Sequence, residues 1–287
     1  MRSLGRVSLM IVMVCCVALS ACDEDGGGDD AGPGMADSGP GDTDSGPGDT
    51  DAGPGDDAGP GDAGPGDTDA GPAEGEWAVL IRGTLADEPS VIKPQHDALA
   101  AGGEAPAMML GDFAHDVHLG TTLFGTTENQ FIGVDRWTSL SGLMGFYADP
   151  DFMMGFAALF SGMPSVETFA RADDWHEWGS LDAADGTEPH YWVVVRGHLA
   201  DDPTVIQPMH DALAAGGEVP AMAAGDVGHV VYLGVADGRE FLAFDVWTSD
   251  AGIEAFYGNP DFMSGFAMLF DAPASVTVHR STDWHQW

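Results

Sequence analysis

An internal repeat constrains the fold of this chain more than any other feature. Residues 96–104 read His-Asp-Ala-Leu-Ala-Ala-Gly-Gly-Glu, and residues 210–218 repeat them without a change. The motif Trp-His-x-Trp also occurs twice, at residues 175–178 and 284–287. Each repeat of this length forms one structural unit, and the two units can pack together so that each buries apolar surface of the other. We therefore expect two copies of one small domain.

The repeat also sets the domain boundaries. The first copy is expected at residues 77–178 and the second at residues 191–287, with a polar linker at residues 179–190. The alternating residues of strand 241–247 are apolar on both faces in the second copy. A sheet that is apolar on both sides needs two covers, and the other copy can supply one of them.

Each copy shows the same order of predicted elements. In the second copy a β-branched run at residues 191–195 predicts a strand, and Asp202-Pro203 begins an amphipathic helix. A glycine-rich loop is expected after this helix. Strands at residues 230–233 and 241–247 follow, joined at Asp237-Gly238, which favours a hairpin turn. A second helix and a last strand complete a β-α-β-β-α-β unit of the ferredoxin-like kind.

Two motifs of the second copy resemble a known family. The strand end Asp245-x-Trp247-x-Ser249 and the helix start Pro260-x-Phe262 are similar to the antibiotic-biosynthesis-monooxygenase family. The resemblance implies the dimeric α+β barrel fold, in which two sheets pack face to face. We therefore expect an α+β chain whose tandem ferredoxin-like repeats form such a barrel within one molecule, as a monomer with an internal pseudo-dimer.

The same resemblance implies where chemistry would occur. Family members often oxidise quinol-like aromatic molecules with dioxygen in a cavity between sheet and helices, with no metal or flavin. Such a site needs an apolar pocket and groups that handle protons. The candidate catalytic residues are His96, His210, His115, His229, Asp135 and Asp245. The candidate ligand-binding residues are Arg82, Arg196, Trp137, Trp247, Tyr147 and Tyr257.

These candidates also have structural interpretations. Asp245 and Trp247 share one strand face, where the carboxylate could simply pair with Arg196 beside a buried indole. Tyr257 at helical spacing from phenylalanines is often a core residue.

The position of His210 on the first helix supports a sharper hypothesis. Helical spacing places His210 at the edge of a buried stripe formed by Ile206, Met209 and Leu213, with Asp211 pointing outward. A buried imidazole needs a hydrogen-bond partner. His229 on the neighbouring strand could be that partner, in which case His210 would accept a proton or bind a ligand. Alternatively, His210 is a core histidine bonded to a loop carbonyl near Gly225.

Metal and haem cofactors are not expected. The terminal Trp-His-x-Trp motif provides a single imidazole per copy, His176 or His285, which is too few ligands for zinc. We instead expect this motif to cap the sheet edge. Haem-degrading relatives carry a ligating histidine where this chain has Phe156 and Phe266, so the resemblance does not imply haem.

The N-terminus has the pattern of an export signal. Arg2 and Arg6 precede an uncharged apolar run at residues 7–19, which is too short to span a bilayer. The run ends in Leu-Ser-Ala-Cys22, which resembles the lipobox of bacterial lipoproteins. Residues 1–21 are therefore expected to be removed and Cys22 to be lipidated, which would hold the protein at the bacterial cell envelope, facing the periplasm or the surface. The alternative is an ordinary signal peptide that contains a cysteine by chance.

An acidic segment at residues 22–76 follows the predicted lipidation site. It has seventeen acidic residues, no Lys or Arg and no aromatic residue, so we expect a disordered tether. Its Asp-Thr-Asp runs also resemble fragments of calcium-binding repeats, although a closing glutamate of the EF-hand kind is missing. Beyond residue 76 thirty acidic residues face seven basic ones, and this charge excludes nucleic acid as a partner.

Three classes of function remain open from the sequence. The first is a cofactor-independent oxygenase or related small-molecule enzyme. The second is an envelope module that binds an apolar or aromatic ligand without turnover. The third is a structural or partner-binding lipoprotein. A pocket lined by His210 and His229 would favour the first two, and a filled core would favour the third.

Overall fold

The computed structural model describes residues 75–187 and 189–287. The predicted signal peptide, Cys22 and the tether up to residue 74 lie outside the described residues. Within the described part of the chain, no helix is both long and apolar enough to cross a bilayer.

The described residues repeat one order of elements twice. The first half contains β1 (Trp77–Thr84), α1 (Pro89–Met109), β2 (Asp112–Gly120), the short 3-10 helix η1 (Leu123–Gly125), β3 (Gln130–Trp137), α2 (Leu140–Tyr147), α3 (Pro150–Ala157) and β4 (Ser165–Arg171). Two short connecting elements follow, β5 (Trp178–Gly179) and the 3-10 helix η2 (Leu181–Ala184). The second half contains β6 (Tyr191–His198), α4 (Pro203–Ala224), β7 (Asp226–Gly234), β8 (Glu240–Trp247), α5 (Asp250–Tyr257), α6 (Pro260–Ala267) and β9 (Ser275–Ser281).

The long strands form one closed barrel built from both halves. They are hydrogen-bonded in the order β4-β1-β3-β2-β9-β6-β8-β7, and β7 pairs with β4 to close the ring. Both seams between the halves are equivalent, because each joins the second strand of one half to the last strand of the other. The expected α+β barrel is confirmed, and a single chain supplies both of its halves.

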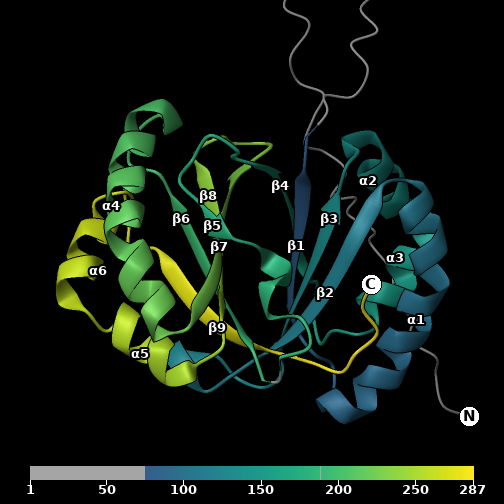
Figure 1. Cartoon of the computed structure of the whole chain (residues 1–287). Helices are drawn as coiled ribbons and strands as arrows, with labels where there is room; N and C mark the ends of the chain where they lie inside the picture. Colours follow the sequence, from purple (N-terminus) through teal and green to yellow (C-terminus); the bar gives the residue numbers. More distant parts are fainter. Residues whose placement is uncertain (1–74, 188) are drawn as a thin grey trace, which may run out of the picture. The chain divides into compact units, whose positions relative to one another are not determined.

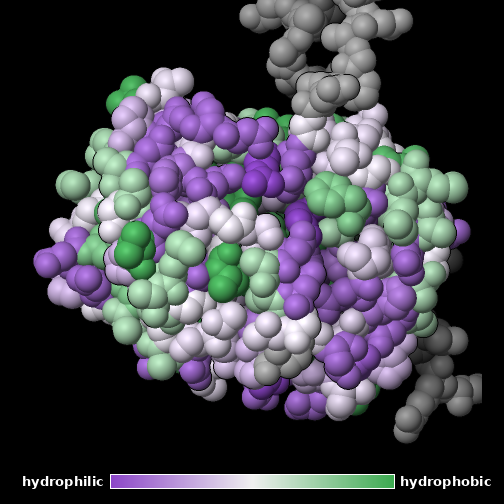
Figure 2. Space-filling model, in the orientation of Figure 1, coloured by the Kyte–Doolittle hydropathy of each residue, from purple (hydrophilic) through white to green (hydrophobic). Residues whose placement is uncertain are grey.

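The helices cover the outside of the barrel. Helices α1, α2 and α3 lie on one side and α4, α5 and α6 on the other (Figure 1). Hydrophobic residues reach the surface over both helical layers (Figure 2), and on α4 Val205, Val219 and Met222 are more than half exposed. The barrel interior is filled by side chains from both halves, which include Leu80, Phe169, Trp192, Tyr232 and Phe244.

Helix α4 is longer than the sequence pattern predicted. The expected glycine-rich loop is wrong, because Gly216 and Gly217 lie inside the helix, which continues to Ala224. A Cβ on Gly217 would already be 3.4 Å from the ring of Phe256, so the glycine lets aromatic residues of α5 and α6 pack closely against the helix. The buried stripe also differs from the expected one, because Met209 is 41% exposed.

The connection between the halves is more than a polar linker. Leu181 and Ala184 of η2 are buried and belong to the barrel interior. Asp182 forms an ion pair with Arg136 of β3. Glu76, which the sequence pattern placed in the tether, bonds Arg171 of β4 at 2.8 Å and accepts a hydrogen bond from Tyr232 of β7. The segment between the halves and Glu76, which precedes β1, therefore both help to hold the two halves together.

Candidate active site

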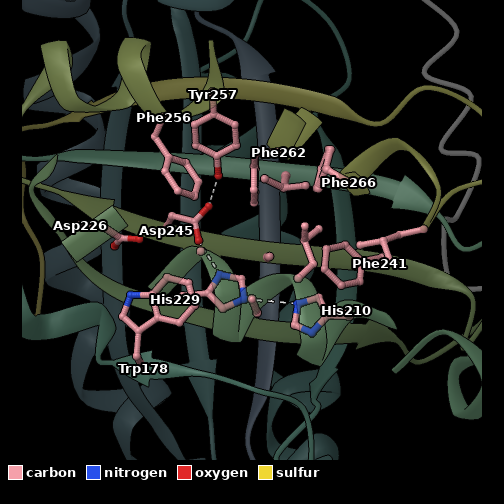
Figure 3. Close-up of a pocket in the computed structure, with 16 residues that line it drawn as sticks. Trp178, His210, Asp226, His229, Phe241, Asp245, Phe256, Tyr257, Phe262 and Phe266 are labelled. Carbon is pink, nitrogen blue, oxygen red and sulfur yellow. Dashed lines mark hydrogen bonds and ion pairs between the residues drawn. The ribbon is translucent and has the colours of Figure 1, made fainter. Parts of the chain in front are cut away.

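Two equivalent pockets lie between the barrel wall and the helices. The second pocket, in the second half, has a cavity of about 40 Å³, and the first pocket, in the first half, has one of about 30 Å³. Phenylalanine side chains form much of both linings, and histidines and aspartates form the polar wall. Figure 3 shows the second pocket.

A chain of hydrogen bonds forms the polar wall of the second pocket. The Tyr257 hydroxyl donates to Asp245, and the other carboxylate oxygen of Asp245 lies 2.5 Å from Nδ1 of His229. The Nε2 atoms of His229 and His210 are 3.4 Å apart (Figure 3). Nδ1 of His210 lies 3.1 Å from Asp211. The predicted meeting of His210 and His229 is therefore observed.

The first pocket repeats this chain. Tyr147 donates to Asp135, whose other oxygen is 2.5 Å from Nδ1 of His115. The Nε2 atoms of His115 and His96 are again 3.4 Å apart, and Nδ1 of His96 is 3.3 Å from Asp97. The structure thus brings together all six candidate catalytic residues, three in each pocket, and both candidate tyrosines.

The secondary structure explains why these side chains meet. His229 and Asp245 are register partners on the antiparallel strands β7 and β8, so their side chains stand next to each other on one sheet face. His210 reaches this face from the buried stripe of α4, and Tyr257 reaches it from the end of α5.

The hydrogen-bond geometry limits the number of protons in the site. When each Nδ1–H donates to a carboxylate, the two Nε2 atoms face each other with their lone pairs. One proton between them turns this contact into an N–H···N hydrogen bond. The His210–His229 pair is therefore built to take up and release a single proton. Burial, with the neighbouring His229, lowers the pKa of His210 to about 4; the pKa of His96 is lowered to about 4 for the same reason, with His115 as the neighbour.

A further carboxyl group lines each pocket and was missed from the sequence. Burial, with the nearby Asp245, raises the pKa of Asp226 to about 9. Burial and Asp135 do the same for Asp112. Both groups are therefore neutral acids near pH 7. The repeat held a usable signal, because both residues follow a glycine at the end of the first helix of their copy.

Two arginines predicted to bind ligand lie elsewhere. Arg82 and Arg196 project into the barrel, on the opposite strand face from the pockets, and both form ion pairs with Glu167 of β4. The expected pairing of Asp245 with Arg196 is therefore wrong. Strand alternation explains this, because Val195 faces the pocket and its neighbour must face the interior.

The two candidate tryptophans also do not line the pockets. Trp137 and Trp247 are fully buried behind them, with ring centroids 5.6 Å from those of Phe146 and Phe256. They are core residues that support the helices.

The Trp-His-x-Trp motif crosses from one half of the barrel to the other. Trp175 packs against His210 and Phe241 of the second half, and the backbone N–H of His176 donates to Asp211. Asp211 therefore does not simply point outward, because it links this segment to His210. In the other direction, Trp284 packs against His96. Each pocket is completed by residues of the opposite half.

The loop between β2 and β3 makes the two pockets unequal. Leu123 of η1 packs against the core of the second half, and the Phe124 ring lies 6.2 Å from that of Tyr257. Tyr257 is buried, whereas Tyr147 of the first pocket is partly exposed.

Neither cavity accepts an aromatic ring as it stands. A cavity of about 40 Å³ holds a few water molecules, whereas a cavity of about 150 Å³ is known to bind benzene. An aromatic ligand therefore has to displace a side chain.

Among the described residues, no group of three or more His, Cys, Asp or Glu side chains is arranged to hold a metal ion.

Comparisons with known proteins identify the fold. No protein family and no curated protein matches the sequence. Among solved structures, a candidate monooxygenase from Fusobacterium nucleatum has a TM-score of 0.54 and 6% identity, over 75% of this chain and 98% of that protein. An anthrone oxidase-like protein has a TM-score of 0.52 and 17% identity, over 75% and 94%. A candidate monooxygenase from Lactobacillus acidophilus has a TM-score of 0.50 and 9% identity, over 73% and 95%.

Proposed function

We propose that each pocket is a general acid–base site that oxidises a small aromatic or quinol-like molecule with dioxygen, without a cofactor. The observation that carries this proposal is the contact between two buried imidazoles, each held by a carboxylate, at the wall of an apolar pocket. This arrangement occurs in both halves of the barrel. The similarity in fold to candidate monooxygenases and to an anthrone oxidase-like protein supports the choice of reaction.

The His210–His229 pair can remove a proton from a bound ligand. Because burial lowers the pKa of His210 to about 4, the pair is unprotonated near pH 7, with its Nε2 atoms 3.4 Å apart and able to accept a proton. A proton taken from a ligand O–H or acidic C–H can lie between these atoms in an N–H···N hydrogen bond. The carboxylates of Asp211 and Asp245 then stabilise the positive charge.

The resulting ligand anion would be the species that reacts with dioxygen. For an anthrone-type CH₂ group, one O₂ supplies the new carbonyl oxygen and one molecule of water, so no other reductant is needed. Asp226, neutral near pH 7, lines the same cavity and can donate a hydrogen bond to an oxygen of the ligand. The phenylalanine walls exclude water from the anion.

We also propose a location for the protein in the cell. We infer from the lipobox-like sequence that Cys22 carries the lipid that anchors a monomeric protein to the bacterial envelope, with the barrel outside the cytoplasm.

The small cavity favours a second candidate function. A pocket that is nearly filled by its own side chains suits a structural module, or one that binds a small apolar ligand without turnover.

Oxygen uptake distinguishes the two candidates. The full chain is mixed with anthrone in the presence of a metal chelator, and O₂ consumption is measured. The double variant His96→Asn with His210→Asn should lose most of the enzymatic rate, whereas His198→Asn, outside both pockets, should retain it. Equal rates in the wild type and the double variant would exclude the oxygenase.

A further inference from the structure

In each pocket an indole from the opposite half covers one imidazole of the histidine pair, His229 or His115. The indole of Trp178 stacks on His229 with 4.4 Å between ring centroids and 24° between planes (Figure 3). Trp287 stacks on His115 at 4.5 Å and 25°. Both indoles are only partly buried, so each lies between the pocket and solvent.

Trp178 has fewer aromatic neighbours than the phenylalanines Phe256 and Phe262 of the same pocket. Phe256 and Phe262 pack among other aromatic rings of the same half, in the layer between α4, α5 and α6. Trp178 instead contacts only the imidazoles of His229 and His176 among rings. The indole also packs on the edge of the second hydrophobic core, and its N–H interacts with the carboxyl group of Asp226, a contact that a ligand hydroxyl can replace.

The backbone on both sides of Trp178 is fixed, so its side chain can move without detaching the segment. The N–H of His176 donates to Asp211 at 2.8 Å. Gly179 has a φ of +63°, and a Cβ there would lie 1.9 Å from the carbonyl oxygen of Val227. Only glycine fits such a position. The indole is therefore held as a side chain on a rigid support.

The space that the indole would vacate has a defined shape and chemistry. It is a flat slot on one face of the His229 imidazole, open to the existing cavity, with the carboxyl group of Asp226 on its border (Figure 3). A ring system that entered it would stack as the indole does now. An oxygen on that ring would lie among the proton-handling groups of the pocket.

On the basis of the function proposed above, we propose that the ligand of each pocket is a fused-ring phenol or enol, two of whose rings occupy the area that the indole now covers. It binds by stacking on His229 in place of Trp178, and on His115 in place of Trp287. These two tryptophans set the size and flatness of the ligand. Because each belongs to the opposite half, neither half has a complete site by itself.

Binding of 2-naphthol tests this proposal in the full chain. Trp178→Ala and Trp287→Ala remove the ring that competes with the ligand, so the double variant should bind 2-naphthol about tenfold more tightly than the wild type. Wild-type protein should bind 2-naphthol more tightly than phenol. In protein labelled with 5-fluorotryptophan, saturating 2-naphthol should move the ¹⁹F signals of Trp178 and Trp287 to solvent-exposed positions.

Trp192→Phe serves as the control, because this buried tryptophan lies in the barrel interior and lines neither pocket. Its affinity for 2-naphthol should stay near that of the wild type. Unchanged or weaker binding of 2-naphthol in the double alanine variant would overturn the proposal, as would ¹⁹F signals that do not move. The absence of saturable binding in both the wild type and the double alanine variant would also overturn it. If 2-naphthol binds and displaces the indoles but anthrone is not oxidised, the oxygenase function fails and the stacking site stands.

Discussion

The Nε2 atoms of His210 and His229 lie 3.4 Å apart, while Nδ1 of each imidazole faces an aspartate. When both Nδ1–H groups donate to these aspartates, the two Nε2 lone pairs face each other until a proton lies between them. This relationship, repeated by His96 and His115, distinguishes the pockets from a filled hydrophobic core.

We expect Asp245 to contribute more to the catalytic rate than to the stability of the fold. Asp245→Asn, with Asp135→Asn in the first pocket, removes the negative charge that supports a protonated imidazole pair. The kcat for anthrone oxidation should fall by about 10²- to 10⁴-fold, which is the usual contribution of acid–base catalysis. Circular dichroism should show an intact fold, and a variant that keeps the wild-type kcat would contradict the assigned role.

Asp226 and Asp112 should make the protein less stable at alkaline pH. Each has a pKa of about 9 in the folded state against an ordinary value of 3.8. Between these values the folded state binds the extra proton, so the free energy of unfolding falls as pH rises, by up to about 1.4 kcal/mol per pH unit for each group.

The window from pH 8 to pH 9 isolates this effect, because it lies above the pKa of Asp116, which burial raises to about 7. His96 and His210, whose pKa is lowered to about 4 from the model-compound value of 6.5, reduce stability only as pH falls below 6.5. Urea unfolding of Asp112→Asn with Asp226→Asn should therefore show a flatter profile across this window. A slope equal to that of the wild type would mean that these carboxyl groups are ionised in the folded protein.

Trp175 and Trp284 should couple the stability of the two halves. Each is 6% exposed and belongs to the hydrophobic core of the opposite half. Trp175→Ala or Trp284→Ala should lower the free energy of unfolding by about 3–5 kcal/mol, as large core truncations do. The measurement is urea denaturation followed by circular dichroism, and a loss below about 1 kcal/mol would contradict this packing.

Cys22→Ser should release the protein from the membrane. The variant would lack the thiol that the lipid modifies, so the chain should move from the membrane pellet to the soluble fraction after cell lysis. Detection by immunoblot is sufficient. A variant that stays in the pellet would refute lipidation at this position.

The order of strands and helices and the meeting of His210 with His229 could be predicted because both depend on local patterns, and the family resemblance implied the barrel. Helical spacing placed His210 inward, where His229 of the neighbouring strand could meet it. The contact of His229 with Asp245 depends on the register of β7 and β8, which only the structure gives. Arg196 could not be assigned in this way, because which strand face meets the helices depends on how the barrel closes. The crossing of Trp178 to the other half depends on tertiary structure and left no signal in the spacing of residues.

Asp226 was missed for a different reason. A carboxylate at the start of a strand is usually exposed, and its burial here follows from the way in which Trp178 and the helices close the pocket. The glycine before this aspartate was visible in both copies. Only the structure shows that Asp226 lines the same pocket as His210, and Asp112 the same pocket as His96.

The most direct test of the acid–base site is the absorption spectrum of bound 2-naphthol near pH 7, where the free phenol is neutral. If the imidazole pair takes the ligand's proton, saturating wild-type protein should produce the red-shifted spectrum of the naphtholate anion. The variant His96→Asn with His210→Asn should bind the neutral phenol. A neutral spectrum in the saturated wild type would contradict the account.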